Sequence, residues 1–490
     1  MKYLGVVSLG HDASVAMIED GEILFASHAE RYSRVKNDPN INLELIKDAL
    51  VHGKPDRIVW YEQPLNKALR HLTTGQWDQL PKRNIKAHLA EMGLGDIPLS
   101  TVEHHESHAA AGYYTSTFDD ASILVCDAIG EFTTISIWKA EMNEMKCIFR
   151  EKYPHSLGLL YSAMTQRVGL KPNEEEYILM GMAALGQPKY LNDITTDFMS
   201  PNNQAPHFKM IQNVHKGIMD WKPELNTTQD HYDIAASTQL LTENYLLDTI
   251  KWMKNNLPSN NLILMGGVAL NCKANQLLAE QKIYNNIWIM PNPGDAGSSI
   301  GAVAAYTQER INWKSPYLGY NIKKDIDIMA VVQALVNGDV IGLAHGKAEF
   351  GPRSLGNRSI LADPRGQHIK DKVNAFKKRE MFRPFAPVVM QEHAHNYFNM
   401  PYKDTPYMQF TALCNKPDLI PAVCHYDNTS RVQTVNKEQN YILYTILEEF
   451  YKQTGCPVLL NTSLNIKGQP LVNTWQDAID FSNHYGIKIF

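Results

Sequence analysis

The sequence predicts an α/β protein with more than one domain, and three observations lead to this prediction. The chain has 490 residues, whereas a single hydrophobic core rarely grows beyond about 250–300 residues. Short apolar segments of strand length alternate with longer segments of helical periodicity, which is typical of α/β architecture. A unit of three short strands near the N-terminus recurs roughly 115 residues later, which suggests that the first domain is an internal duplication.

Each repeated unit reads as three strands joined by tight turns. The expected strands are 3–9, 14–19 and 22–28 in the first unit and 122–126, 132–138 and 145–150 in the second. The dipeptide Asp20-Gly21 is a typical hairpin turn. Each unit also places an acidic residue, Asp12 or Asp127, in the loop after its first strand. The two units therefore resemble each other in both structure and polar chemistry.

The rest of the chain completes the two domains. We expect a helix over 234–256, strands at 262–265 and 288–290, and a closely packed helix over 296–305. Residues 312–325 contain Pro316, Gly319 and three lysines, so they are predicted to be an interdomain linker. A strand at 340–343 then opens the second domain. The predicted domains are 1–315 and 316–490.

The composition excludes several classes of protein. With 44% hydrophobic and 20% charged residues, the chain is an ordinary globular protein. Its formal charge of −5 excludes a globally basic nucleic-acid binder, although a local basic groove at Lys82, Arg83 and Lys86 stays open. No apolar run reaches the roughly 20 residues that span a bilayer. Six scattered cysteines without a Cys-x-x-Cys pair favour a reduced, cytoplasmic protein.

Two histidines and two aspartates are candidate metal ligands. His104 and His108 are four residues apart, so on a helix they share one face and can present imidazole nitrogens to one ion. Asp127 and Asp295 follow predicted strands, where functional groups of α/β folds concentrate. Two histidines and two aspartates suit iron or zinc better than calcium. The alternative is that the histidines are surface or capping residues and that Asp295 caps a helix.

Glycines and cations mark two candidate anion sites. Gly266-Gly267 breaks a predicted strand and opens a helix through Asn271, an arrangement that lets a ligand approach the backbone. In the second domain, Arg353 and Arg358 lie among Gly, Pro and Leu, which suits guanidinium groups aimed at phosphate. Further candidate phosphate donors are Lys378, Arg383, Arg431, Asn461 and Ser463. For the lysine run, a solvated charged face is the alternative.

Several segments together resemble the O-carbamoyltransferases that modify antibiotics and nodulation factors. The resemblance covers nearly the whole chain, and the ordered set of segments is specific although no single one is. In the first domain the segments are 10–14, 30–36, 104–109, 266–271 and 293–297. In the second they are 349–353, 379–387 and 461–465.

The resemblance implies a fold and a reaction. The N-terminal domain would be similar to Kae1 proteins, which have an actin-like ATPase fold, and the C-terminal domain would be YrdC-like. Family members use ATP and carbamoyl phosphate to make carbamoyladenylate in the YrdC-like domain. The intermediate then passes internally to the Kae1-like domain, where an acceptor hydroxyl is carbamoylated.

The resemblance also implies roles for single residues. His11 would be the general base, and His104, His108, Asp127 and Asp295 would hold the metal, Fe(II) in relatives, with zinc or manganese as alternatives. The remaining roles form three groups. Carbamoyladenylate would contact Lys36, Gly267 and Asn271; carbamoyl phosphate would contact Arg353, Arg431 and Ser463; and ATP, with Mg²⁺, would contact Lys378, Arg383 and Asn461.

Other functions and several acceptors stay open at this point. The alternatives are a threonylcarbamoyl-type tRNA-modifying enzyme and a non-catalytic, actin-like nucleotide-binding module. Hydrogenase maturation enzymes are disfavoured because their zinc-finger cysteines are absent. The acceptor is expected to be a sugar or polyketide hydroxyl, or a hydroxymethylated pyrimidine in DNA, although the net charge does not indicate DNA. The chain is short for the family, so a trimmed C-terminal domain is expected.

Overall fold

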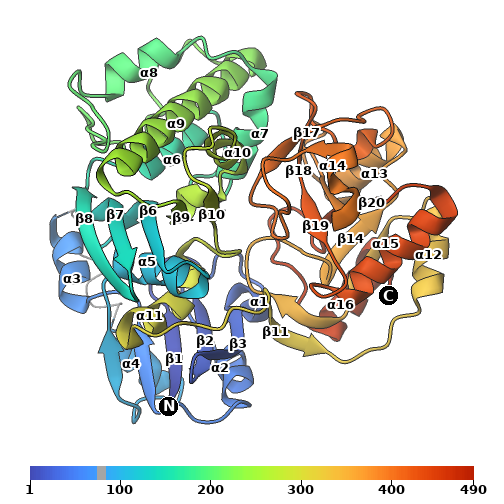
Figure 1. Ribbon diagram of the computed structural model, residues 1–490, viewed down its shortest axis with the longest axis horizontal. Helices are drawn as coiled ribbons and strands as arrows, with labels where there is room; N and C mark the ends of the chain where they lie inside the picture. The colour runs from blue at the N-terminus through green and yellow to red at the C-terminus, as the bar shows by residue number, and fades with distance from the viewer. Residues whose placement is uncertain (74–83) are drawn as a thin grey trace. The chain divides into compact units, whose positions relative to one another are not determined.

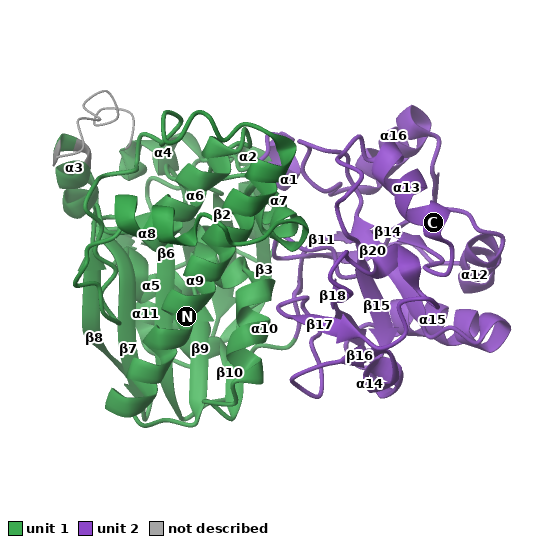
Figure 2. Ribbon diagram, turned by 90° about the horizontal axis from the view of Figure 1, so that it is seen from above, with its two compact units in different colours: residues 1–29, 37–314 green, residues 30–36, 315–490 purple. Residues whose placement is uncertain are grey.

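The computed structural model describes residues 1–73 and 84–490 and divides into two compact units, coloured separately in Figure 2. Unit 1 comprises Met1–Ala29 and Asn37–Lys314, and unit 2 comprises Glu30–Lys36 and Ser315–Phe490. Of the basic groove expected at residues 82–86, Lys82 and Arg83 lie outside the described residues, whereas Lys86 is exposed on α4 (Ile85–Glu91). Among the helices in the described ranges, none combines the length and apolar character needed to cross a membrane.

Unit 1 contains two five-stranded sheets with the same topology. The first sheet has the order β3-β2-β1-β4-β5 and the second β10-β9-β6-β7-β8. In each sheet the three strands that come first in the chain pair antiparallel to one another. The fourth strand pairs in parallel with the first, and the fifth pairs in parallel with the fourth. The first sheet consists of β1 (Lys2–Val7), β2 (Ser14–Glu19), β3 (Glu22–His28), β4 (Arg57–Trp60) and β5 (Leu99–Thr101). The second consists of β6 (Asp120–Gly130), β7 (Thr133–Glu141), β8 (Glu144–Lys152), β9 (Asn261–Met265) and β10 (Asn286–Trp288). The repeated hairpin unit of the sequence therefore appears as a repeated strand order.

Two helices lie between the sheets, and each crosses from its own sheet to the other (Figure 1). Helix α5 (His104–Thr115) follows β5 but packs on β6 and β9, whereas α11 (Ser298–Thr307) follows β10 but packs on β1, β2 and β4. The helices also pack against each other, and Gly301 permits this contact because a Cβ there would lie 1.9 Å from the carbonyl oxygen of Ser107. This crossing brings residues of both halves together at the carboxyl ends of the strands.

The two halves differ in the connection between their third and fourth strands. In the first half this connection holds only α1 (Glu30–Ser33) and α2 (Leu43–Leu50). In the second half it holds a helical insertion, seen in green in Figure 1, of α6 (Leu157–Arg167), α7 (Glu176–Met182), α8 (Leu191–Phe198) and α9 (Thr228–Asn256). Helix α9 begins six residues before the expected start at 234 because Thr227 and Asp230 form a capping box. Unit 1 also contains α3 (Pro64–Thr73) and α10 (Cys272–Glu280).

Unit 2 is built on a six-stranded mixed sheet of order β19-β15-β20-β14-β12-β21. These strands are β12 (Ile341–Ala344), β14 (Arg358–Ala362), β15 (Ala386–Met390), β19 (Gln433–Val435), β20 (Val458–Ser463) and β21 (Lys488–Ile489). A smaller sheet contains β16 (Phe398–Asn399), β17 (Thr411–Cys414) and β18 (Thr429–Arg431). The helices are α12 (Ile328–Val336), α13 (Gln367–Phe376), α14 (Ala394–Tyr397), α15 (Tyr441–Thr454) and α16 (Trp475–Tyr485). Buried aliphatic side chains of α12, α15 and the central strands form its core.

The linker prediction for residues 312–325 is wrong in its central part. Residues Tyr317–Ile322 form β11, which pairs antiparallel with β13 (Gly346–Glu349). The Gly, Pro and Lys content suggested a loop, but the partner strand satisfies the backbone groups. The units divide between Lys314 and Ser315.

A second departure from the sequence prediction is that residues 30–36 belong to unit 2. Arg31 is 2% exposed and donates a hydrogen bond to the carbonyl oxygen of Gly351 at 3.0 Å. Arg34 likewise donates to the carbonyl oxygen of Pro470 at 3.0 Å. The chain therefore enters unit 2 once between β3 and β4, before it enters again at Ser315.

Candidate metal centre and anion-binding site

Four side chains that are distant in sequence converge in unit 1. One ligand atom from each of His104, His108, Asp127 and Asp295 lies within 4.8 Å of the other three. The Nε2 atoms of the two histidines are 3.2 Å apart. Asp127 Oδ2 lies 3.5 Å from His104 Nε2 and 3.4 Å from His108 Nε2, and Asp295 Oδ1 lies at the same two distances.

These separations fit a small divalent transition metal. Four ligands about 2.1 Å from an ion in tetrahedral arrangement are about 3.4 Å from one another. The five separations between donor atoms given above are 3.2–3.5 Å. Imidazole and carboxylate donors suit zinc, iron or manganese, whereas calcium needs six to eight oxygen ligands. The residues present therefore fit a divalent transition metal as a class.

The ligands come from the carboxyl ends of strands in both halves. His104 and His108 occupy the first turns of α5, after β5, while Asp295 opens the short turn after β10. Asp127 lies on β6. A Cβ at Gly130 would lie only 2.2 Å from His104 Cδ2, so a glycine leaves space for this imidazole. His105, which lies between the two ligands, is buried with its Nδ1 2.8 Å from Ser136 Oγ and does not join the cluster.

Neighbouring groups orient the ligand atoms toward the centre of the cluster. The carbonyl oxygen of Pro293 lies 3.2 Å from His108 Nδ1, so this nitrogen donates its proton there and Nε2 is left to bind. Asp127 Oδ1 accepts from the backbone N–H of Ala128 at 2.8 Å and of Gly267 at 3.3 Å, which leaves Oδ2 for the ion. Behind His104, the carboxylate of Glu62 lies 3.6 Å from Nδ1.

Glu62 is a residue that sequence reasoning missed. It is 3% exposed, follows β4 and forms an ion pair with buried Lys67. Burial alone would raise the pKa of Glu62, but Lys67 and His104 outweigh burial and lower that pKa to about 2. Glu62 is therefore a carboxylate that can hold the His104 ring in place, as outer carboxylates do at many metal centres. No local motif marks it, because Glu62 meets His104 only through the pairing of β4 with β5.

The negative charges of the cluster can be offset either by protonated histidines or by a bound divalent cation. Burial opposes charge on His104, yet Asp295, Asp127 and Glu62 raise its pKa well above the usual value. The pKa of His108 is also raised, and the two histidines hold the pKa of Asp127 well below its usual range although burial opposes this. Two imidazolium groups offset the two carboxylates without an ion, and a divalent cation with two neutral imidazoles offsets them equally.

Metal binding should therefore depend steeply on pH. Because both histidine pKa values are raised, the ion must displace up to two protons, and the apparent Kd should fall by up to about a hundredfold per pH unit on raising the pH toward 8. Competition with a chromophoric zinc chelator measures this dependence directly. His108→Gln should weaken binding, whereas the exposed control His395→Gln should not. An affinity that is independent of pH would contradict the assignment.

Three other predicted residues of unit 1, His11, Gly267 and Asn271, differ from one another in what surrounds them. His11 is exposed in the loop after β1, and a Cβ on its neighbour Gly10 would approach Tyr61, whose ring contacts that of His104 at 5.0 Å between centroids. Gly267 touches the cluster through its hydrogen bond to Asp127. Asn271 caps α10, and its side-chain amide pairs with that of Gln239 at 2.9 Å. Lys36 belongs to unit 2.

A second cluster of charged groups lies in unit 2 around Lys377, which sequence reasoning also missed. Lys377 is 3% exposed, and its ammonium donates to Ser463 Oγ at 3.1 Å and to Asn465 Oδ1 at 3.0 Å. Burial, followed by the charges of Arg379 and Arg383, lowers the pKa of Lys377 well below its usual value. The acceptors of Lys377 are neutral oxygens, whereas Arg383 lies 3.5 Å from the carboxylate of Glu380. An anionic ligand would therefore stabilise Lys377 above all.

The position of Lys377 differs from that of its predicted neighbour Lys378. Lys378 is exposed, has a left-handed backbone conformation and places its ammonium 5.9 Å from the centre of the Tyr485 ring. The helical period separates the two lysines, since Lys370, Val373, Asn374 and Lys377 are all buried along one face of α13 and its cap.

Asn461 connects the segments that carry the other predicted anion ligands. It is 1% exposed, and its Nδ2 donates to the carbonyl oxygen of Ser354 at 3.2 Å and to Gln433 Oε1 at 2.7 Å. Ser354 follows Arg353, and Gln433 lies two residues after Arg431. Asn461 itself lies two residues before Ser463 on β20. The buried amide thus holds the half-buried Arg353 and Arg431 segments beside the strand that ends at Ser463.

The interpretation of Arg358 as a phosphate ligand is wrong. Its side chain is completely buried and donates hydrogen bonds to backbone carbonyl oxygens of His345, Tyr320 and Asn473 at 2.7–3.0 Å. Burial lowers its pKa to about 10. Its position among Gly, Pro and Leu reflected a structural role, because a guanidinium is the side chain with enough donors to satisfy several converging carbonyl groups.

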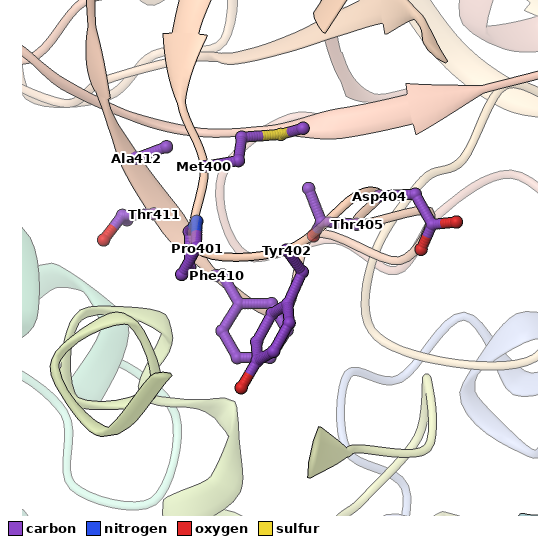
Figure 3. A pocket seen from close by; sticks show the side chains of 8 residues that line it. All are labelled: Met400, Pro401, Tyr402, Asp404, Thr405, Phe410, Thr411 and Ala412. Atoms are coloured by element: carbon purple, nitrogen blue, oxygen red, sulfur yellow. The ribbon is translucent and has the colours of Figure 1, made fainter. Parts of the chain in front are cut away.

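A small pocket of unit 2 lies beside β18, because Thr411 in its lining pairs with Arg431 (Figure 3). Its walls are mainly the apolar side chains of Met400, Pro401, Phe410 and Ala412, together with the ring of Tyr402. The only charged residue in its lining is Asp404, so the pocket offers no cation to a phosphate. The anion site is therefore better placed at Lys377.

Comparison with known proteins decides the family. A family described as "Carbamoyltransferase N-terminus" matches residues 78–304, and one described as "Carbamoyltransferase C-terminus" matches residues 332–490. The chain belongs to the carbamoyltransferase family. The resemblance found in the sequence is thus confirmed, and the protein is a transferase.

Three relatives of this carbamoyltransferase match almost its whole length. Nodulation protein NolNO of Sinorhizobium fredii is 31% identical over 96% of this chain and 76% of its own length. The 3'-hydroxymethylcephem-O-carbamoyltransferase of Amycolatopsis lactamdurans is 25% identical over 98% of this chain and 96% of its own length. An uncharacterized protein of Synechocystis sp. is 36% identical over 97% of this chain and 93% of its own length.

Much of the length difference from the Synechocystis protein is internal. The alignment with the Synechocystis protein spans 572 positions, more than the 490 residues of this carbamoyltransferase, so the relative has additional residues between matched segments. Among solved structures, HypF of T. kodakarensis covers 63% of this chain and 47% of its own, at 14% identity and a TM-score of 0.35.

Proposed function

We propose that this carbamoyltransferase is an ATP-dependent O-carbamoyltransferase that works in two steps, one in each unit. Unit 2 makes carbamoyladenylate from carbamoyl phosphate and ATP, and unit 1 transfers the carbamoyl group to an acceptor hydroxyl. The observation that supports this division most strongly is that unit 2 has a buried cationic cluster at Lys377, while unit 1 has a four-ligand metal cluster. A polyanion and a metal-assisted transfer need these different surroundings.

The first step has a balanced chemical description. Water cleaves the anhydride bond between the carbamoyl group and the phosphate of carbamoyl phosphate, and gives carbamate and inorganic phosphate. A carbamate oxygen then attacks the α-phosphorus of ATP, the bond to the β-phosphate oxygen breaks, and pyrophosphate leaves. Lys377 and Arg383, with Arg353 and Arg431, would offset the charge of the phosphates, and Ser463 would donate a hydrogen bond to the carbamoyl phosphate. We retain Lys378 as an outer ATP contact and assign Asn461 a supporting role.

In the second step, unit 1 would bind the adenylate next to the four-ligand cluster. Gly267, and Asn271 at the start of α10, would contact the intermediate, with Lys36 as a further cationic contact. His11 would accept the proton of the attacking hydroxyl, because imidazole titrates close to neutral pH. We propose Fe(II) as the ion held by the four ligands, and Mg²⁺ as the ion that accompanies ATP in unit 2. The ion in unit 1 would supply Lewis acidity toward the carbamoyl carbonyl or a phosphate oxygen.

The fold of each unit supports this division of labour. The repeated sheet topology of unit 1, with α5 and α11 between the sheets, supports an actin-like domain of the Kae1 type. The mixed six-stranded sheet of unit 2, with cations gathered beyond β20, supports a YrdC-like domain. On this proposal the carbamoyl-transfer domain is residues 1–315 without the segment 30–36, and residues 316–490 form the adenylate.

For the acceptor we propose a small-molecule hydroxyl, as the names of the cephem and nodulation relatives suggest. A hydroxymethylated pyrimidine in DNA is a less favoured acceptor, since the net charge is −5. A panel that includes a hydroxymethylcephem, an aminosugar and hydroxymethylcytidine separates these classes by mass spectrometry of the carbamoylated product.

Pyrophosphate release tests the proposed reaction without knowledge of the acceptor. Purified, metal-loaded protein should release pyrophosphate from ATP when carbamoyl phosphate is added. Replacing carbamoyl phosphate with bicarbonate and threonine should give no release, which separates the proposal from threonylcarbamoyl chemistry. Absence of pyrophosphate under all conditions would contradict the ATP-dependent adenylate mechanism.

A further inference from the structure

A buried histidine connects the loop of the proposed base to the loop of the metal ligands. His28, at the end of β3, is 3% exposed, and its Nδ1 lies 3.2 Å from Asp12 Oδ1. Its Nε2 lies 3.1 Å from the side-chain nitrogen of Asn292. An amide nitrogen can only donate, so Nε2 of His28 accepts, and the ring proton resides on Nδ1 and is donated to Asp12.

The other end of this connection reaches the metal cluster. Asn292 is 2% exposed and precedes Pro293, whose carbonyl oxygen orients His108. Two residues after Pro293 comes the ligand Asp295. Hydrogen bonds and one stretch of backbone thus run from Asp12 through His28 and Asn292 to the cluster. Its two central residues, His28 and Asn292, are buried, so little water competes with the hydrogen bond between them.

The loop that carries His11 needs such support. Leu9 and Asp12 both have left-handed backbone conformations, with φ of 64° and 59°, and such residues cost of order 1–3 kcal/mol unless surrounding contacts hold them. The backbone N–H groups of Leu9 and Ala13 donate to the carbonyl oxygens of Pro39 and Asp38 at 2.7 and 2.8 Å, which fixes both ends of the loop. His28 supplies the side-chain contact between them.

Asp12 and Asp127 occupy corresponding positions in the two halves of unit 1 but have different partners. Asp12 follows the first strand of the first sheet as Asp127 lies at the end of the first strand of the second. Asp127 joins the metal cluster, whereas Asp12 pairs with His28. The aspartate at this position is thus a candidate metal ligand in the second half. In the first half it forms an Asp–His pair next to His11.

We propose that His28 is a positioning residue for carbamoyl transfer, which holds Asp12 and thereby His11 at a fixed place relative to the metal cluster. This inference rests on the proposed function. In the transfer, the hydroxyl oxygen bonds to the carbamoyl carbon and its proton goes to His11. The bond from that carbon to the adenylate phosphate oxygen breaks, and AMP leaves with the electron pair. A displacement of about 1 Å in such a base can cost about 10²-fold in rate.

Two substitutions separate the two hydrogen bonds of His28. The amide of asparagine reaches approximately the position of Nδ1, so His28→Asn keeps a donor for Asp12. The amide of glutamine reaches approximately the position of Nε2, so His28→Gln keeps a partner for Asn292 instead. AMP release is measured with water and glycerol as probe nucleophiles, alongside the pyrophosphate burst and zinc affinity of the same samples.

We expect His28→Gln to slow AMP release by about 10²-fold with the pyrophosphate burst and zinc affinity unchanged, while His28→Asn recovers most of the rate. Equal rates for both variants, or equal losses accompanied by weakened zinc binding, would overturn the positioning role in favour of a structural one. If the wild-type protein gives no pyrophosphate burst, the proposed function fails first. If it gives the burst but the variants behave alike, only the role of His28 fails.

Discussion

Replacing Lys377 with methionine should reduce carbamoyl-phosphate-dependent pyrophosphate release by about 10²–10³-fold, the effect expected when a preorganised charged donor is removed. Methionine fills a similar volume but cannot offset phosphate charge. The free energy of unfolding should stay the same or rise by about 1 kcal/mol, because a buried ammonium without a carboxylate partner is itself costly. Loss of activity together with unchanged or greater stability is typical of a residue kept for function.

The adjacent lysine provides a matched control for this experiment. Lys378→Met removes the same charge one residue away, at an exposed position, and should change pyrophosphate release by less than tenfold. Steady-state pyrophosphate assays and chemical denaturation measure both variants. A larger loss for Lys378→Met than for Lys377→Met would show that the exposed lysine contacts ATP and that the buried one is structural.

Replacing Asp295 with asparagine should strongly weaken metal binding and reduce carbamoyl transfer to the background rate, while leaving adenylate formation intact. Asp295 Oδ1 lies 3.5 and 3.4 Å from the Nε2 atoms of His104 and His108, so its charge is central to the cluster. A neutral amide oxygen is a weaker ligand for a divalent transition metal. We expect at least about a 10²-fold loss of zinc affinity, beyond the 10–100-fold typical of outer partners.

The half-reactions of this variant test whether the two units act separately. Pyrophosphate release by Asp295→Asn should equal that of the wild type, and AMP release should fall to the background rate. Asp248→Asn, on the exposed surface of α9, controls for the loss of one carboxylate. If Asp295→Asn lost both half-reactions equally, the division between units would be contradicted.

Local signals explain why much of unit 1 could be predicted. The strands 14–19 and 22–28 have the predicted bounds because the Asp20-Gly21 turn fixes their register. The metal cluster was also predictable, since the spacing of His104 and His108 on a helix and the placement of acids at strand ends are local features. What the sequence could not reveal is that α5 and α11 each cross to the opposite sheet, which brings the four ligands together.

The failures have a common cause in contacts between distant segments. Residues 317–322 look like a linker until β13 pairs with them. Residues 30–36 belong to unit 2 through contacts with distant residues, among them Gly351, Pro470 and Leu471. Arg358 looked like a phosphate ligand because its carbonyl partners come from three separate segments. Lys377 is different, because a local pattern could have identified it. The helical period of α13 places Lys377, but not Lys378, on the buried face of the helix.

The most direct test of the two-step account is to look for the intermediate itself. Asp295→Asn protein is mixed with ATP and isotopically labelled carbamoyl phosphate without an acceptor, quenched and analysed by mass spectrometry. The account predicts labelled carbamoyladenylate in amounts that match the pyrophosphate released, and none with Lys377→Met. Labelled product formed on an acceptor without ATP, or pyrophosphate released without any carbamoyladenylate, would contradict it.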